Sequence, residues 1–280
     1  MNISRSLFVR LVALMALAAA VLPRGADGGV IVNLGKLEIE LGPNGRTTRQ
    51  LEIANTDNKP ANVSVFVADW SQDENGAVEA VDPSKTKAPD SASAWIGVDP
   101  QRFVLQKGEK KNVTVSIATP KGALPLKEYR SMVFTETAET RPPQAAAPGR
   151  ELQVRVINRI GTKIFLRNPQ GQTKLDCEVT KVAEETRDGK RGLGIQVANR
   201  GDVHLESDNS KVAFRNAAGV TVETVPVSSF SILPGKTRTA FFELPEPGKS
   251  KLQKGKKYNA LAVIDYGGND LVAGELELTY

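Results

Sequence analysis

The sequence predicts an all-β protein with two immunoglobulin-like β-sandwich domains in tandem, preceded by an N-terminal signal peptide. Three observations support this prediction. The length of 280 residues exceeds the roughly 100 to 200 residues of an ordinary domain. Apolar residues recur with a period of two, and turn signals separate these runs at short intervals. No long run with the helical period of 3.6 follows the leader, which disfavours a parallel sheet covered by helices.

Residues 1–26 have the composition of an export signal. Arg5 and Arg10 precede an apolar run over 11–22, and Pro23 ends that run. The run is shorter than the roughly 20 residues that a membrane-spanning helix needs, which favours a cleaved signal peptide over an uncleaved anchor. We therefore expect an exported, periplasmic protein without stable membrane insertion after cleavage.

The charge balance excludes a general electrostatic attraction to nucleic acid. The whole chain has 37 basic and 32 acidic residues, a formal net charge of +5. The leader contributes Arg5, Arg10 and Arg24 and no acidic residue. Without these three, the chain is close to neutral, so we expect no nucleic-acid partner.

Half-buried strands are predicted wherever apolar and polar residues alternate, because successive side chains of a strand point to opposite faces. In chain order, the alternating runs are 37–41, 63–67, 113–117, 152–156, 193–197, 220–222, 260–264 and 276–278. Turn signals between the runs are Pro43-Asn44-Gly45, Asn58-Lys59-Pro60, Glu74-Asn75-Gly76, Lys107-Gly108, Asp188-Gly189, Pro234-Gly235 and Gly267-Gly268. This pattern favours antiparallel Greek-key packing.

Two connectors divide the chain. The proline-rich stretch 140–149 is predicted to form a mobile loop without strands. The shorter stretch Asn168–Gln172 suits a hinge, because the strand run before it ends there and new short strands follow. The predicted domains are therefore 27–168 and 169–280.

The residues that usually carry catalysis or bind metals are scarce. His204 is the only histidine and Cys177 the only cysteine, so no intramolecular disulfide can form and we expect no metal site and no cofactor. We expect His204 to lie on a strand in a structural or solvated position, and Cys177 to pack in a core. No catalytic motif is present, which predicts a protein that is not an enzyme. An enzyme with an acidic cleft or a sugar-binding module is a further alternative, but Trp70 and Trp95 are better explained by core packing.

The run from Glu151 to Leu166 has two different faces if it forms one strand. Its even positions Leu152, Val154, Val156 and Ile160 are apolar, whereas its odd positions Arg155, Arg159, Lys163 and Arg167 are basic. The apolar face could pack in the first core while the basic face meets water. Alternatively, the strand lies at a sheet edge and offers its backbone to an incoming strand.

The order of several segments resembles the periplasmic pilus chaperones, the PapD-like proteins, as a divergent member. The similar segments are Leu51-Glu52-Ile53-Ala54-Asn55, then 99–108 (DPQRFVLQKG), then 124–131 (LPLKEYRS), and then the run from Glu151 to Leu166. In the final third, Asn199-Arg200-Gly201, Leu233-Pro234-Gly235 and Tyr266-Gly267-Gly268 suit the second domain of that family.

This resemblance implies a chaperone-like protein that stabilises an exported pilin-type or surface subunit by β-strand donation. The donor positions are Leu152, Val154, Val156 and Ile160. The resemblance also implies that two basic residues bind the carboxylate at the end of the subunit, and Lys36 and Lys163 are the candidates. Lys36 stands where the family usually has an arginine. An outer-membrane usher is a further candidate partner.

The alternative function is that of a structural or adhesive envelope protein, in which the tandem sandwiches are themselves the product. A neighbouring strand that covers the edge of the donor strand would favour this alternative.

Overall fold

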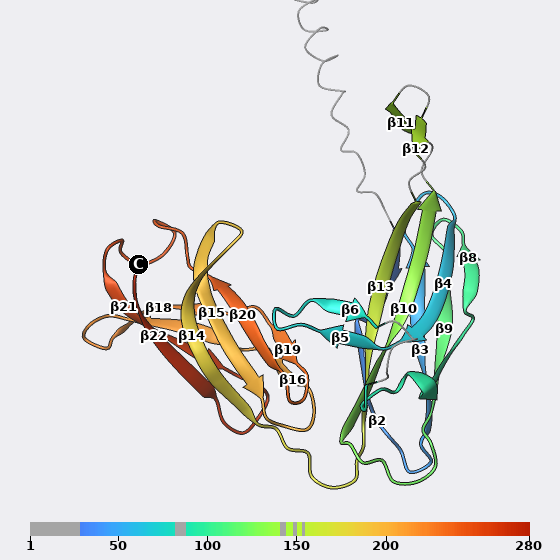
Figure 1. Cartoon of the computed structure of the whole chain (residues 1–280), viewed down its shortest axis with the longest axis horizontal. Coiled ribbons are helices and arrows are strands. Elements are labelled where there is room, and N and C mark those ends of the chain that lie inside the picture. Colours follow the sequence, from blue (N-terminus) through green and yellow to red (C-terminus); the bar gives the residue numbers. More distant parts are fainter. Residues whose placement is uncertain (1–28, 82–87, 141–143, 148–149, 153–154) are drawn as a thin grey trace, which may run out of the picture.

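The computed structural model describes residues 29–81, 88–140, 144–147, 150–152 and 155–280. The predicted signal peptide lies outside these residues. The described part of the chain contains two β-sandwiches joined in tandem, which confirms the predicted fold class (Figure 1). Within it there is no helix with the length and apolarity needed to cross a membrane.

The first domain packs a four-stranded sheet against a five-stranded sheet. The four-stranded sheet has the order β1 (Val30–Val32), β3 (Arg46–Asn55), β9 (Lys110–Ala118) and β7 (Ile96–Asp99). The five-stranded sheet has the order β2 (Lys36–Glu40), β13 (Arg155–Arg167), β10 (Glu128–Thr140), β4 (Ala61–Ala68) and β8 (Arg102–Leu105). A 3-10 helix, η1 (Ser93–Trp95), precedes β7. The chain changes sheet between β1 and β2, because β1 pairs with β3 whereas β2 pairs with β13.

Two small hairpins extend from this domain. One consists of β5 (Trp70–Gln72) and β6 (Val78–Ala80), and the other of β11 (Gln144–Ala147) and β12 (Arg150–Leu152). The second hairpin corrects one prediction. The stretch 140–149 is not free of strands, because β11 pairs with β12. Leu152 lies on β12, and residues 153–154 between β12 and β13 lie outside the described residues, so a single strand over 151–166 stays a prediction.

The second domain contains three sheets. The first has the order β14 (Cys177–Arg187), β15 (Lys190–Asn199) and β20 (Thr237–Glu243). The second pairs β16 (Leu205–Ser207) with β19 (Phe230–Ile232). The third has the order β18 (Thr221–Pro226), β17 (Lys211–Arg215), β21 (Lys257–Ile264) and β22 (Val272–Thr279). The Asp188-Gly189 turn joins β14 to β15, and both turn residues have positive φ (49° and 76°). Such backbone angles match the twist of a two-residue hairpin, and Asp and Gly tolerate them well.

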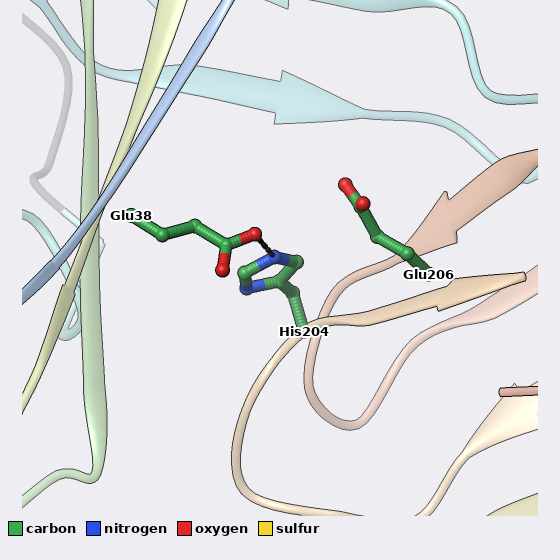
Figure 2. Close-up of side chains that lie close together, drawn as sticks. All are labelled: Glu38, His204 and Glu206. Carbon is green, nitrogen blue, oxygen red and sulfur yellow. Dashed lines mark hydrogen bonds and ion pairs between the residues drawn. The ribbon is translucent and has the colours of Figure 1, made fainter. Parts of the chain in front are cut away.

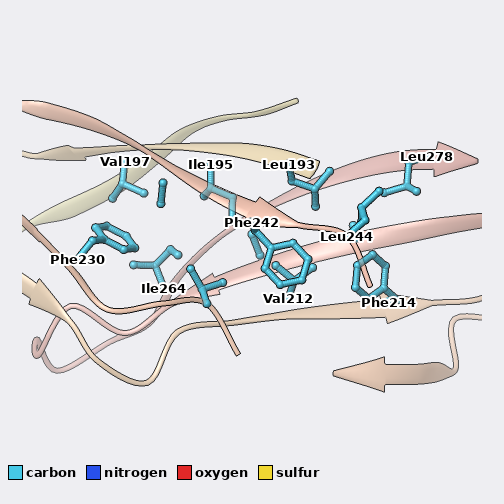
Figure 3. Packing of buried hydrophobic residues seen from close by; sticks show 14 of the residues in the cluster. Leu193, Ile195, Val197, Val212, Phe214, Phe230, Phe242, Leu244, Ile264 and Leu278 are labelled. Atoms are coloured by element: carbon cyan, nitrogen blue, oxygen red, sulfur yellow. The ribbon is translucent and has the colours of Figure 1, made fainter. Parts of the chain in front are cut away.

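Each sandwich has its own apolar core, and alternation along the strands builds it. On β9, Val113, Val115 and Ile117 are at most 2% exposed. In the second domain, β15 contributes Leu193, Ile195 and Val197, which face β17 and β21 across the sandwich (Figure 3). Cys177 is buried at the edge of this second core, as predicted.

The two domains are in contact through the β5–β6 hairpin and through a small apolar cluster. The hairpin reaches from the first domain to the second (Figure 1), where the amide of Thr239 on β20 donates to the carbonyl of Glu74 over 2.7 Å. Leu233 of the second domain packs with Trp70, Phe165 and Met132 of the first. Trp70 is therefore buried, as predicted, but between the domains and not inside one sandwich. Trp95 packs against the first core beside Tyr129.

Candidate functional site

One half of β13 is paired on both sides and the other half on one side only. Its partner β10 runs along the whole strand, from Arg155 to Arg167. On the opposite side, β2 pairs only with Lys163–Arg167. The earlier strand β1 could have continued this pairing, but it belongs to the other sheet. Within the described part of the chain, residues 155–162 of β13 therefore form an open sheet edge.

The direction of the backbone groups follows from one hydrogen bond. The amide of Lys163 donates to the carbonyl of Gly35 over 3.0 Å, so the backbone groups of Lys163 point away from β10. Because the direction alternates along a strand, those of Gly161, Arg159 and Ile157 point the same way. Three residues thus present an amide and a carbonyl to an incoming strand. The side chain of Ile157 is 49% exposed beside them.

Two even-numbered positions of this open half, Asn158 and Ile160, border a cleft in the first domain. Val156 and Ile160 are half-buried and Asn158 is exposed. The cleft has a volume of about 400 Å³, and Val30, Asn55, Thr135, Asn158 and Ile160 are among its lining residues. Farther along β13, Ile164 and Leu166 are fully buried in the first core. The apolar face is therefore closed at the C-terminal half of the strand and accessible at its N-terminal half.

The four predicted donor residues have different positions. Val156 and Ile160 lie on the open half of β13. Leu152 lies on β12, and Val154 lies outside the described residues. The structure therefore brings two of the four onto one exposed edge.

The two predicted anchor residues, Lys36 and Lys163, are direct neighbours. They are partners in the parallel register of β2 and β13, at the point where the open edge ends. The two lysines are 127 positions apart in the chain, so no local pattern relates them. Only the family resemblance predicted that they act as a pair. Their role as a carboxylate anchor stays a prediction.

Lys36 is already engaged in two ion pairs. Its Nζ lies 2.6 Å from Oε1 of Glu38 and 2.6 Å from Oε2 of Glu206, a residue of β16 in the second domain. Burial opposes the charge of Lys36, but these two carboxylates outweigh the burial and raise its pKa. Lys36 therefore connects the domains in this structure.

Lys163 has a different environment. Its Nζ lies 5.1 Å from the centre of the Trp70 ring, and no described carboxylate lies within 4.0 Å of it. Burial lowers the pKa of Lys163, and the positive charge of Arg238 lowers it further. A partly buried cation without a close counter-ion is well placed to bind an anion.

One alternative expected the basic side chains at the odd positions of β13 to contact only water. The structure shows other contacts for them. Arg159 forms an ion pair with Glu136 (2.7 Å) and lies over the rings of Phe66 and Phe134. Phe165, on the same face, is 1% exposed in the cluster between the domains. This face is therefore turned partly toward the second domain.

His204 is a central residue of the interdomain contact, a place that the sequence did not predict. It was expected on a strand in a structural or solvated position. It lies just before β16, outside any strand, and is only 3% exposed, as a structural residue would be. Its ring stacks on Phe165 with centres 3.7 Å apart. Its Nδ1 lies 2.7 Å from Oε2 of Glu128. Its Nε2 lies 3.2 Å from Oε1 of Glu38 (Figure 2). Nothing in the local sequence indicates these partners, which come from β10 and β2.

A group of possible metal ligands is present at the same place, although none was expected. Donor atoms of Glu38, His204 and Glu206 all lie within 4.8 Å of one another. The ammonium of Lys36 contacts both carboxylates of this group. The site therefore already accommodates one cation, which belongs to the chain itself.

No protein-family model and no curated protein matches the chain. Among solved structures, it is similar to a chaperone in a complex with a tip adhesin of CFA/I fimbriae biogenesis, at 11% identity and a TM-score of 0.45, over 88% of this chain and 98% of that one. It is also similar to the Pseudomonas aeruginosa chaperone CupB2, at 14% identity and a TM-score of 0.42, over 89% and 99% of the two chains. The E. coli chaperone DraB is similar at 17% identity and a TM-score of 0.42, over 89% and 98%.

Proposed function

We propose that this chain is a periplasmic chaperone-like protein that binds an exported pilin-type or surface subunit by β-strand donation. The observation that carries the proposal is the open edge of β13 at residues 155–162, which ends at the adjacent residues Lys36 and Lys163. An open edge next to a half-buried apolar face is a template for another strand. A structural envelope protein would be favoured if a neighbouring strand covered the edge of β13. No described strand pairs with residues 155–162 on that side.

The donating strand supplies both backbone and side-chain contacts in this proposal. Gly161, Arg159 and Ile157 offer outward amides and carbonyls, and Val156 and Ile160 offer apolar side chains. Complete burial of each of these two side chains contributes about 1.5–3 kcal/mol before the entropic cost of association. The backbone bonds fix direction and register, while the side chains select the groove of the partner.

The two lysines mark the end of the bound strand. A chain that pairs with the open half of β13 meets Lys36 and Lys163 where β2 begins. A terminal carboxylate at this point neutralises the uncompensated charge of Lys163. We therefore propose that Lys163 is the stronger anchor and that Lys36 contributes after it leaves Glu38 or Glu206.

The test is affinity capture of the purified protein's partner from an envelope extract. We compare wild type with a Val156→Asp and Ile160→Asp double variant, after circular dichroism has shown that the variant is folded. Val220→Asp is the matched control, because Val220 is an exposed (58%) valine of the second domain. Capture of a small β-rich subunit by wild type and control, but not by the double variant, supports strand donation. Equal capture by all three proteins, or capture by none, contradicts it.

A further inference from the structure

The ring of His204 directs its two nitrogens to two different carboxylates. Its Nδ1 is hydrogen-bonded to Glu128. Its Nε2 faces Oε1 of Glu38 over 3.2 Å (Figure 2). Donor atoms of Glu38, His204 and Glu206 lie within 4.8 Å of one another, which is close enough for all three residues to hold one ion.

The arrangement of Glu128 and His204 is typical of a metal-binding histidine. A ligand histidine usually donates its second ring N–H to a carboxylate, which fixes both the tautomer and the orientation of the ring. Glu128 lies in this position, 2.7 Å from Nδ1, and its other oxygen accepts the backbone amide of His204 over 2.9 Å. The stacked ring of Phe165 holds the imidazole plane from one side.

The remaining ligands come from both domains. Glu38 lies on β2 of the first domain, whereas His204 and Glu206 belong to the second. The side chains of Glu38 and Glu206 are each 35% exposed, so an ion can reach them from solvent, while that of His204 is 1% exposed. One imidazole with two carboxylates suits zinc and similar transition metals, whereas calcium and magnesium prefer oxygen ligands alone.

We propose that Glu38, His204 and Glu206 form an interdomain site for a divalent transition-metal cation of the zinc class, and that the cation displaces the ammonium of Lys36. Lys36 now neutralises the two carboxylates at 2.6 Å each. A divalent cation in the same place has twice the charge of the ammonium and gains a ring nitrogen of His204 as a third ligand. Lys36 is therefore an internal competitor for the site.

The experiment is isothermal titration calorimetry of the purified, chelator-treated protein with zinc chloride in a non-coordinating buffer. We expect saturable binding of one equivalent, and no saturable binding of calcium chloride. Glu206→Gln keeps the shape of a half-exposed ligand and is expected to weaken binding at least about tenfold. Glu128→Gln, which removes only the orienting carboxylate, is expected to weaken it by about 10- to 100-fold.

Two further variants make the result specific. Glu184→Gln is the matched control, because Glu184 is a similarly exposed (42%) carboxylate in an ion pair with Arg191, outside the proposed site. It is expected to bind zinc as wild type does. Lys36→Met is expected to bind more tightly, because the competitor is gone.

Three outcomes overturn the proposal. The first is that zinc shows no saturable binding. The second is that Glu206→Gln binds zinc as well as wild type does. The third is that Lys36→Met binds zinc more weakly than wild type, because displacement of the ammonium predicts the opposite.

Discussion

Individual residues at the domain boundary have partners that are distant in the chain. His204 contacts Glu128, Glu38 and Phe165, each on a different strand of the first domain. The sequence places His204 only between two apolar neighbours, which is why a structural or solvated position was the natural expectation. Its burial and its two carboxylate partners depend on how the domains meet, and no local pattern contains that information.

Cys177 allows a quantitative prediction at this scale. Burial raises the pKa of its thiol to about 11, from an ordinary value of 9.0. At pH 8 the folded protein therefore has about a hundredfold less thiolate than the unfolded chain. We expect iodoacetamide to alkylate the native protein at least about a hundredfold more slowly than the urea-unfolded protein.

The same shift has a consequence for stability. Because the folded pKa lies above the unfolded pKa, the contribution of Cys177 is fully present below pH 9.0 and is lost as the pH rises toward about 11. Cys177→Ala should lack this alkaline loss in urea titrations. Fast alkylation of the native wild type at pH 8 would contradict the assignment.

Lys163 allows a second prediction. Burial and the nearby charge of Arg238 lower the pKa of its ammonium, so the charged form is disfavoured in the free protein. In Lys163→Met the apolar stem remains and the charge is gone. We expect the midpoint of thermal unfolding to stay the same or rise, while capture of the partner falls.

The two measurements together separate an anchor from a structural residue. If the unfolding midpoint of Lys163→Met falls, the charge of Lys163 does not destabilise the free protein, and this part of the prediction is wrong. Unchanged capture contradicts the role of Lys163 at the end of the bound strand.

At the scale of elements, alternation predicted most strands because one face of each sheet is buried. Runs such as 113–117 and 260–264 became β9 and β21 with their apolar side chains inside. The prediction failed at residues 144–147, where successive alanines give no clear period and a local hairpin provides the pairing. The adjacency of Lys36 and Lys163 was accessible only through the order of motifs, since strand pairing between distant segments has no local signal.

The open edge of β13 predicts opposite effects of proline at neighbouring positions. The amide of Ile157 points to the open edge, whereas that of Asn158 points to β10. Because proline lacks this amide, Ile157→Pro removes a donor that has no partner in the free protein. We expect Ile157→Pro to stay folded and lose partner capture, and Asn158→Pro to unfold at clearly lower urea concentration.

Urea unfolding followed by circular dichroism measures the first effect, and capture from the envelope extract measures the second. If the two proline variants are equally destabilised, the backbone of β13 is hydrogen-bonded along both of its edges, and the edge away from β10 is not open. Retained capture by a folded Ile157→Pro protein would argue against backbone pairing with the partner.

The whole molecule combines two independent cores with a small contact between them. The first core contains buried residues from 37 to 166, and the second from 177 to 278. Between them lie the cluster around Leu233, the β5–β6 hairpin, and the network of Glu38, Glu128, Lys36 and His204. The angle between the domains therefore depends on few residues, although each sandwich has a core of its own.

Leu233→Asp tests this dependence. Leu233 is 2% exposed and contributes the second domain's part of the apolar cluster. A carboxylate at this position cannot stay in the contact without a partner, so we expect the domains to separate while both sandwiches remain folded. Small-angle X-ray scattering should then show a larger radius of gyration, and Trp70 fluorescence should shift to longer wavelength.

The control for this test is Val220→Asp, which changes an exposed valine of the same domain. It should leave the radius of gyration and the fluorescence unchanged. A compact Leu233→Asp protein with wild-type fluorescence would show that other contacts are sufficient to hold the domains together.

The change of sheet between β1 and β2 gives the open edge a fixed end. Since β2 begins at Lys36, opposite Lys163, a visiting strand cannot pair beyond residue 162 in that direction. In the proposed complex this end is a stop that sets the register of the visiting strand. A shift by one residue would turn its apolar side chains to the wrong face, and a fixed stop at the two lysines prevents that shift.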